Sequence, residues 1–180
     1  QKLPAGSYLR FSKGKVSGPE RYWRYEDIAI SGMREPFTHE SEALAALDAQ
    51  LKSAVASHMV SDVPLGAFLS GGIDSSTVAA LMQAQSGKSI KTFSIGFHEA
   101  AYNEAVHASA VARHLGTDHT ELYVNDADTQ SVIPLLPAIY DEPFADASQI
   151  PTFLVAQLAR KQVTVALSGD GGDELFGGYN

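Results

Sequence analysis

The pattern of apolar and polar positions changes about 36 residues into the chain. Residues 1–36 carry aromatic side chains and glycines without a helical period, which predicts one or two short strands and turns, with a hairpin around Ser12–Lys15. From Thr38 onward, apolar residues recur at helical spacing as far as Met59, and Thr38 is the expected N-cap. We therefore expect a short strand and linker segment followed by one folded domain over residues 37–180.

The remainder of the chain alternates short apolar runs with helical stretches. We expect strands at 63–69, 90–97, 119–124 and 163–167, and helices at 74–84, 103–115 and 149–161. A further helical stretch follows Asn125 or Asp126 as its cap and is broken near Pro134 and Pro137. This alternation predicts an α/β fold, a doubly wound parallel sheet with helices on both faces. In the common strand order the first and fourth of these strands are neighbours, and ligands bind beside their carboxyl ends.

These two strands are followed by similar loops, Ser70–Ser76 and Ser168–Glu174, each with Ser, Gly and acidic residues. Glycines let the backbone approach a ligand closely, and free N–H groups at a helix start favour an anion. Carboxylates among such donors would repel a bare phosphate, but together with phosphate oxygens they suit magnesium. One such loop alone is usually only a turn. The pair predicts a magnesium–nucleotide site, although the chain has neither a Walker-type loop nor the dinucleotide Gly-x-Gly-x-x-Gly pattern after the first strand.

Composition narrows the class of protein. The net charge of −8 argues against a surface for nucleic acid or membrane. The absence of cysteine excludes disulfides, thiolate metal sites and a cysteine nucleophile within this chain. No apolar run approaches the roughly 18 residues of a membrane span. We expect a cytoplasmic protein, and the sequence leaves a homodimer open.

The six histidines show no metal-binding spacing and are expected to face solvent. They are His39, His58, His98, His107, His114 and His119.

Two motifs carry a resemblance to known families. Ser70–Ser75 resembles the pyrophosphate loop of the ATP pyrophosphatases, whose fold is a Rossmann-like variant of the adenine nucleotide alpha hydrolase type. Leu167–Tyr179 resembles the class B, glutamine-hydrolysing asparagine synthetases, as do the segments 92–97 and 141–151. The resemblance implies that residues 1–36 are the tail of a preceding glutaminase domain with its linker. Residues 37–180 would then be the N-terminal part of the synthetase domain.

The resemblance also implies roles for individual residues, with ATP and Mg²⁺ as cofactors. The adenosine would contact Leu69, Ile95, Ser168 and Gly169. The pyrophosphate would be held by Ser70, Gly71, Gly72, Ser75 and Ser76. Asp74, beside the nucleotide, would bind Mg²⁺ together with Asp173. Asp170 would be the catalytic residue, at a position tied to the acyl-adenylate and the incoming ammonia, where many relatives carry Glu.

Two further groups of polar residues could serve either ligand binding or the local structure. Glu99, Tyr102 and Glu104 would border the nucleotide or cap a helix. Asp141, Glu142, Asp146 and Ser148 would face the amino-acid substrate or serve only the local structure.

The implied activity is that of an ATP-dependent amide-forming ligase. It would activate the aspartate side-chain carboxylate as an acyl-adenylate for attack by ammonia from a glutaminase domain in the same full-length chain, giving asparagine, AMP and pyrophosphate. The alternatives are an amidotransferase acting on a sugar acid or a β-lactam precursor, a tRNA-modifying ATP pyrophosphatase, which the acidic charge disfavours, and a non-catalytic nucleotide-binding module.

The family has an N-terminal cysteine and a downstream lysine that this chain lacks. We expect a piece of a longer protein that does not make asparagine alone.

Overall fold

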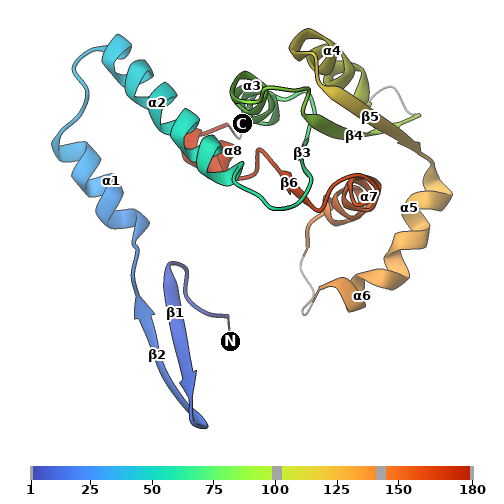
Figure 1. Cartoon of the computed structure of the whole chain (residues 1–180). Helices are drawn as coiled ribbons and strands as arrows, with labels where there is room; N and C mark the ends of the chain where they lie inside the picture. The colour runs from blue at the N-terminus through green and yellow to red at the C-terminus, as the bar shows by residue number, and fades with distance from the viewer. Residues whose placement is uncertain (1, 99–102, 141–144, 179–180) are drawn as a thin grey trace. The chain divides into compact units, whose positions relative to one another are not determined.

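The computed structural model describes residues 2–98, 103–140 and 145–178. The chain forms two compact units, residues 1–48 and 49–180, which are treated separately (Figure 1). Four residues discussed above lie outside the described residues: Glu99, Tyr102, Asp141 and Glu142. No helix among the described residues is both long enough and apolar enough to cross a lipid bilayer.

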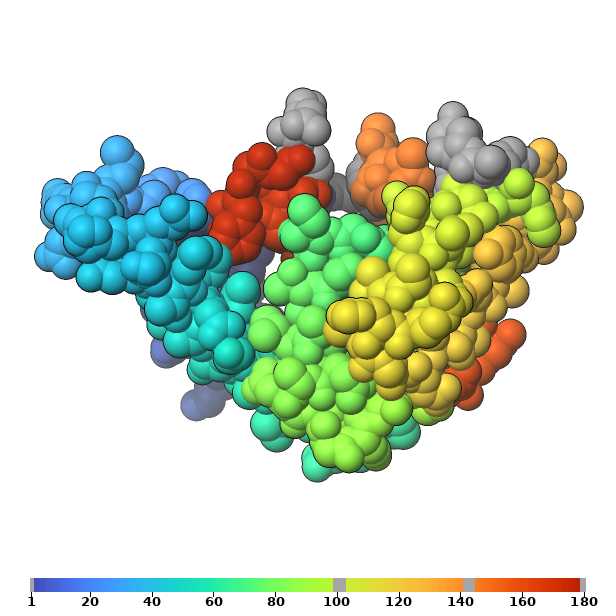
Figure 2. Space-filling view, turned by 90° about the horizontal axis from the view of Figure 1, so that it is seen from above, coloured from blue at the N-terminus to red at the C-terminus, as the bar shows by residue number. Residues whose placement is uncertain are grey.

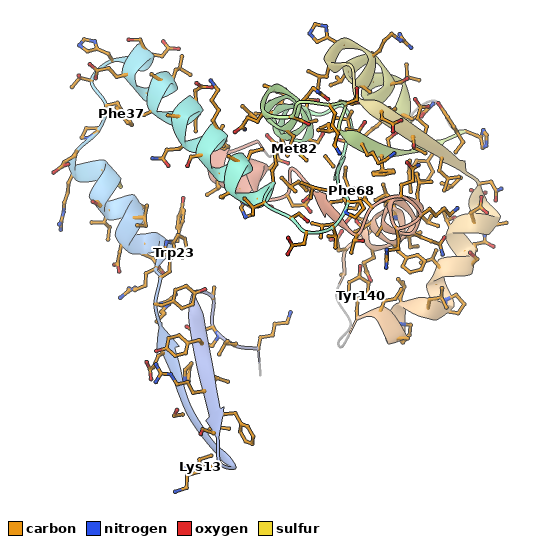
Figure 3. The ribbon with its side chains drawn as sticks, in the orientation of Figure 1. Lys13, Trp23, Phe37, Phe68, Met82 and Tyr140 are labelled. Carbon is orange, nitrogen blue, oxygen red and sulfur yellow. The ribbon has the colours of Figure 1, made fainter. Side chains whose placement is uncertain are left out.

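The first unit begins with the predicted hairpin. Strands β1 (Ser7–Ser12) and β2 (Lys15–Arg21) pair antiparallel, and Lys13 lies at the tip, as Figure 3 shows. The turn residues Lys13 and Gly14 both have positive φ, 50° and 76°, which is typical of the tight turn that closes a hairpin.

The first unit also contains a helix that the sequence analysis missed. Helix α1 (Tyr25–Arg34) occupies a segment for which we expected strands and turns. None of its side chains is buried, but Tyr25, Ile28 and Ala29 follow helical spacing. Glu26 and Asp27 in its first turn also favour a helix start through the helix dipole. Both signals were available and were obscured by the strand-like aromatic and glycine pattern around them.

Helix α2 (Glu40–His58) starts later than its predicted cap. Thr38 is not the N-cap, because the backbone carbonyl of His39 accepts the hydrogen bonds from the N–H groups of Glu42 and Ala43. The preceding backbone therefore provides the helix start, and the threonine hydroxyl is not needed for it.

The second unit is built on a parallel sheet with the predicted neighbours. Its strands are β3 (Leu65–Phe68), β4 (Lys91–Phe97), β5 (Asp118–Val124) and β6 (Val165–Leu167), in the spatial order β5-β4-β3-β6. Ala67 pairs with Leu167, so β3 and β6 end side by side and their following loops leave the same edge. This order confirms the predicted doubly wound arrangement.

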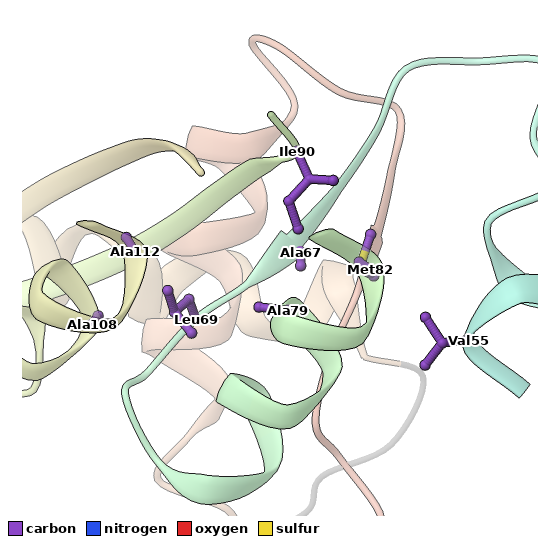
Figure 4. Close-up of a cluster of buried hydrophobic side chains, with 8 residues drawn as sticks. All are labelled: Val55, Ala67, Leu69, Ala79, Met82, Ile90, Ala108 and Ala112. Carbon is purple, nitrogen blue, oxygen red and sulfur yellow. The ribbon is translucent and has the colours of Figure 1, made fainter. Parts of the chain in front are cut away.

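Helices cover both faces of this sheet. The helices of this unit are α3 (Ile73–Gln85), α4 (Ala105–Leu115), α5 (Asp126–Val132), a 3-10 turn (Ile133–Leu135), α6 (Leu136–Ile139), α7 (Gln149–Ala159) and, after β6, α8 (Gly172–Phe176). On one face Ala67 and Leu69 pack with α3, α4 and Val55 of α2, and Figure 4 shows this cluster. On the other face Phe68 and Phe93 pack with α7. The predicted strands and helices of this unit are present, and their ends agree with the predicted ends to within two residues.

One histidine departs from the expected solvent exposure. The side chain of His119, on β5, is only 10% exposed. Its Nδ1 lies 2.8 Å from Thr92 Oγ1 and its Nε2 lies 3.2 Å from Ser94 Oγ, both on β4. Burial lowers the pKa of His119 below its ordinary 6.5, and the negative charge of Glu121 opposes that effect. His119 is thus a partner of neighbouring-strand hydroxyls, which a period-of-two strand pattern does not reveal.

Candidate functional site

The first candidate loop joins β3 to the start of α3. Gly71 has φ +86°, and a Cβ there would lie 2.7 Å from the backbone nitrogen of Ala108, so both conformation and packing require glycine. Gly72 is the residue before the helix, and no side chain caps the helix. Within the described residues, no acceptor lies in hydrogen-bonding geometry to the N–H groups of Gly71, Ile73 or Asp74. These donors lie at the helix start where the sequence predicts an anion, and that binding stays a prediction.

The serine hydroxyl groups of this loop differ in their hydrogen-bond partners. The Ser70 and Ser75 oxygens lie 2.8 Å apart, and Ser75 is buried. The Ser76 Oγ is also buried and has no hydrogen-bond partner among the described residues. The loop therefore contains Ser70, Ser75 and Ser76, as expected. That these serines bind a pyrophosphate stays a prediction.

The second candidate loop joins β6 to α8. Its Ser168 hydroxyl donates a hydrogen bond to Asp170 Oδ2 at 3.0 Å, which holds that carboxyl group at the loop surface. Gly171 precedes α8 with φ +93°, and the Gly172 N–H donates to the Gly169 carbonyl at 3.1 Å. The glycines thus make the tight turn between Asp170 and Asp173.

The two loops contact each other closely. A Cβ at Gly169 would lie 2.6 Å from the backbone nitrogen of Ser75, and a Cβ at Gly172 would lie 2.5 Å from Asp74 Oδ2. In the space-filling view, the red surface of the 172–178 region borders the green surface of α3 (Figure 2). The role of Gly172 was missed by sequence reasoning. Its signal was the Gly171–Gly172 pair, but nothing in the sequence showed what it would touch.

Asp74 and Asp173 form the acidic pair between the loops. Partial burial raises the pKa of Asp173, and the negative charges of Asp74 and Glu174 raise it further. Two carboxylates that repel each other beside free N–H donors suit a divalent cation that arrives with an anion. Among the described residues no group of three or more His, Cys, Asp or Glu could hold a metal alone. The donor set therefore fits magnesium, which commonly takes one or two carboxylates and fills its remaining positions with phosphate oxygens and water.

A pocket of about 610 Å³ adjoins the second loop. Its lining includes Asp170 and Asp173 from the loop, and Asp146, Ser148, Gln149, Thr152 and Tyr140 from the segments around the start of α7. Tyr140, labelled in Figure 3, follows α6. Hydrogen bonds from Ser148 lower the pKa of Asp146, one of them from its N–H to Asp146 Oδ1 at 2.8 Å. Sequence reasoning pointed to Asp146 and Ser148 but missed Tyr140 and Thr152, which stood outside every motif.

Two predicted adenosine contacts lie in the core. The Leu69 side chain is 1% exposed and packs among the residues of α3 and α4. The Ile95 side chain packs against the Val124 and Leu154 cluster. A contact from Leu69 to a nucleotide would have to come from its backbone, while Ser168 and Gly169 lie in the second loop itself.

Comparisons with known proteins identify the family to which the chain is similar. Residues 46–180 match the family described as asparagine synthase. The putative glutamine-hydrolyzing asparagine synthetase 2 of Methanocaldococcus jannaschii is 45% identical over 159 residues, which is 88% of this chain and 30% of that protein. The glutamine-hydrolyzing asparagine synthetase 1 of Bacillus subtilis is 41% identical over 143 residues, 79% of this chain and 22% of that protein. The chain thus spans less than a third of the length of these relatives.

Two solved structures share the fold. The NH3-dependent NAD synthetase from Campylobacter jejuni in complex with nitrate has a TM-score of 0.50 and 16% identity, over 73% of this chain and 58% of that one. The glutamine-dependent NAD+ synthetase from Acinetobacter baumannii in complex with ADP has a TM-score of 0.51 and 24% identity. The match covers 72% of this chain and 26% of that one. At these identities the likeness concerns the fold alone, and it confirms the predicted fold class.

Proposed function

The chain belongs to the asparagine synthase family, and from this premise we propose that its second unit binds the nucleotide of an ATP-dependent ligase that converts aspartate to asparagine. The observation that carries the proposal is the meeting of the two loops, which brings Asp74 and Asp173 together beside the free N–H groups at the start of α3. A non-catalytic nucleotide module would not need this costly pairing of like charges.

The first loop would hold the phosphates of ATP. The N–H groups of Gly71, Ile73 and Asp74 donate to phosphate oxygens, and the dipole of α3 favours their negative charge. Asp74 and Asp173 would hold Mg²⁺, which when bound would stabilise the charge that develops on the leaving pyrophosphate. The N–H donors act at the same place and need no rearrangement during the reaction.

The pocket beside the second loop would hold the acyl group. A carboxylate oxygen of aspartate would attack the α-phosphorus, forming the bond to phosphorus while the bond to pyrophosphate breaks. Ammonia would then attack the activated carbonyl carbon and AMP would leave, with a proton released from the nitrogen. Asp170 lines the pocket and accepts a hydrogen bond from Ser168, which supports the proposal that its carboxylate would accept hydrogen bonds from the incoming ammonia.

In this proposal, the ammonia comes from a glutaminase domain that is not among the described residues. We propose that residues 1–36 are the tail and linker of a glutaminase domain in a longer, cytoplasmic protein. The names of the relatives, which are glutamine-hydrolyzing synthetases, support the glutaminase domain. Such a protein would combine glutamine hydrolysis with amide formation in one chain, and no nucleic acid or membrane would take part.

The test is ATP–pyrophosphate exchange by the full-length protein. The proposal predicts magnesium-dependent exchange that aspartate stimulates. Exchange stimulated by another carboxylate and not by aspartate would favour a homologous amidotransferase, and no exchange with any carboxylate would overturn acyl-adenylate formation.

A further inference from the structure

The buried hydroxyl of Ser75 is bonded within its own loop. Ser75 Oγ accepts a hydrogen bond from the Ser70 N–H at 3.2 Å and lies 2.8 Å from the Ser70 Oγ. It also donates to the Gly72 carbonyl at 3.4 Å. With its one proton directed to Gly72, the contact with the Ser70 Oγ uses the proton of Ser70.

Ser70 extends this network to the next glycine. The Gly72 N–H donates to Ser70 Oγ at 3.2 Å. The N–H groups of Ser70 and Gly72 are therefore both used inside the loop. The neighbouring N–H groups of Gly71, Ile73 and Asp74 have no acceptor among the described residues. The loop thus separates N–H donors that hold its shape from N–H donors that have no acceptor among the described residues.

We propose that Ser75 is a positioning residue of the pyrophosphate loop and not a phosphate ligand, an inference that rests on the proposed function. Its hydroxyl fixes Ser70 and Gly72, and the phosphate is bound by the N–H groups of Gly71, Ile73 and Asp74. Preformed donors of this kind avoid the entropic cost of ordering the loop when the nucleotide binds.

The first experiment measures amide hydrogen exchange in the ligand-free full-length protein. Ser75→Ala removes the acceptor of the Ser70 N–H and frees the Ser70 hydroxyl, so exchange at the Ser70 and Gly72 amides should become roughly tenfold faster. The matched control is Thr77→Ala. Thr77 is a hydroxyl residue of the same helix whose Oγ1 donates to the Ile73 carbonyl at 2.8 Å, outside this network. Unchanged protection at both amides in Ser75→Ala would overturn the inference.

The second experiment is a double-mutant cycle on binding of magnesium pyrophosphate to the full-length protein. If Ser75 acts through Ser70, Ser75→Ala should weaken binding about tenfold in the native background and clearly less in a Ser70→Ala background. Additive losses would show that Ser75 contacts the phosphate itself and would contradict the inference. Absence of binding by the unmodified protein would instead count against the proposed function, while the exchange result for Ser75 would still decide the loop structure.

Discussion

The side chain of Asp74 lies directly against the backbone of Gly172, so that a Cβ at position 172 would stand 2.5 Å from the Asp74 Oδ2. These residues are almost a hundred positions apart in the chain, yet the neighbouring positions of β3 and β6 bring their loops together. The magnesium site proposed above depends on this contact, because it places Asp74 and Asp173 within reach of one cation.

Gly172→Ala should disrupt the contact between the loops. The added methyl group would displace the Asp74 carboxyl, at a cost of about 1–3 kcal/mol in stability and roughly tenfold or more in ATP–pyrophosphate exchange. The matched control is Gly87→Ala, because a Cβ at Gly87 would meet no atom within 4 Å. Urea denaturation and exchange assays on the full-length protein would measure both effects. Equal behaviour of the two variants would show that the close approach at Gly172 has no role.

Asp173→Asn should make the ligand-free protein more resistant to heat. Burial raises the pKa of Asp173, and the negative charges of Asp74 and Glu174 raise it further. The uncharged amide removes both penalties. The same change should abolish the stabilisation that magnesium with pyrophosphate gives to the native protein. Thermal melts with and without the ligand would check both expectations. A lower melting temperature for ligand-free Asp173→Asn would mean that the carboxylate has a structural partner instead.

His119 should make stability depend on pH. Its folded pKa lies below 6.5, so its contribution is fully present above the unfolded pKa and is lost as the pH falls through the folded pKa. Thr92, Ser94 and Thr117 around it are uncharged, and Glu121 is the charged group that faces it.

The test compares His119→Gln with the native protein by urea denaturation at several pH values. The variant should lose less stability than the native protein below neutral pH, whereas His114→Gln, which changes an exposed residue of α4, should keep the native slope. A slope unchanged in His119→Gln would show that this imidazole is protonated equally well in both states.

The arrangement of the sheet could be predicted from the sequence, because apolar runs alternate with helical stretches and parallel connections follow one hand. The two loops could be placed at one edge for the same reason. Helix α1 was missed because it lies in a segment rich in aromatic and glycine residues, although its acidic first turn and the helical spacing of Tyr25, Ile28 and Ala29 indicated it. The bonding of Ser75 inside its loop, and the contact of Gly172 with Asp74, depend on distances between segments that a single sequence does not encode in any period or motif.

The most direct test of the account is calorimetric binding of magnesium pyrophosphate to the full-length protein and its variants. The account predicts binding that requires magnesium, with Asp74→Asn and Asp173→Asn each weakening it at least about tenfold. Asp62→Asn, at an exposed loop position before β3, should bind as the native protein does. Native affinity in both Asp74→Asn and Asp173→Asn would contradict the claim that these two loops form one magnesium–pyrophosphate site.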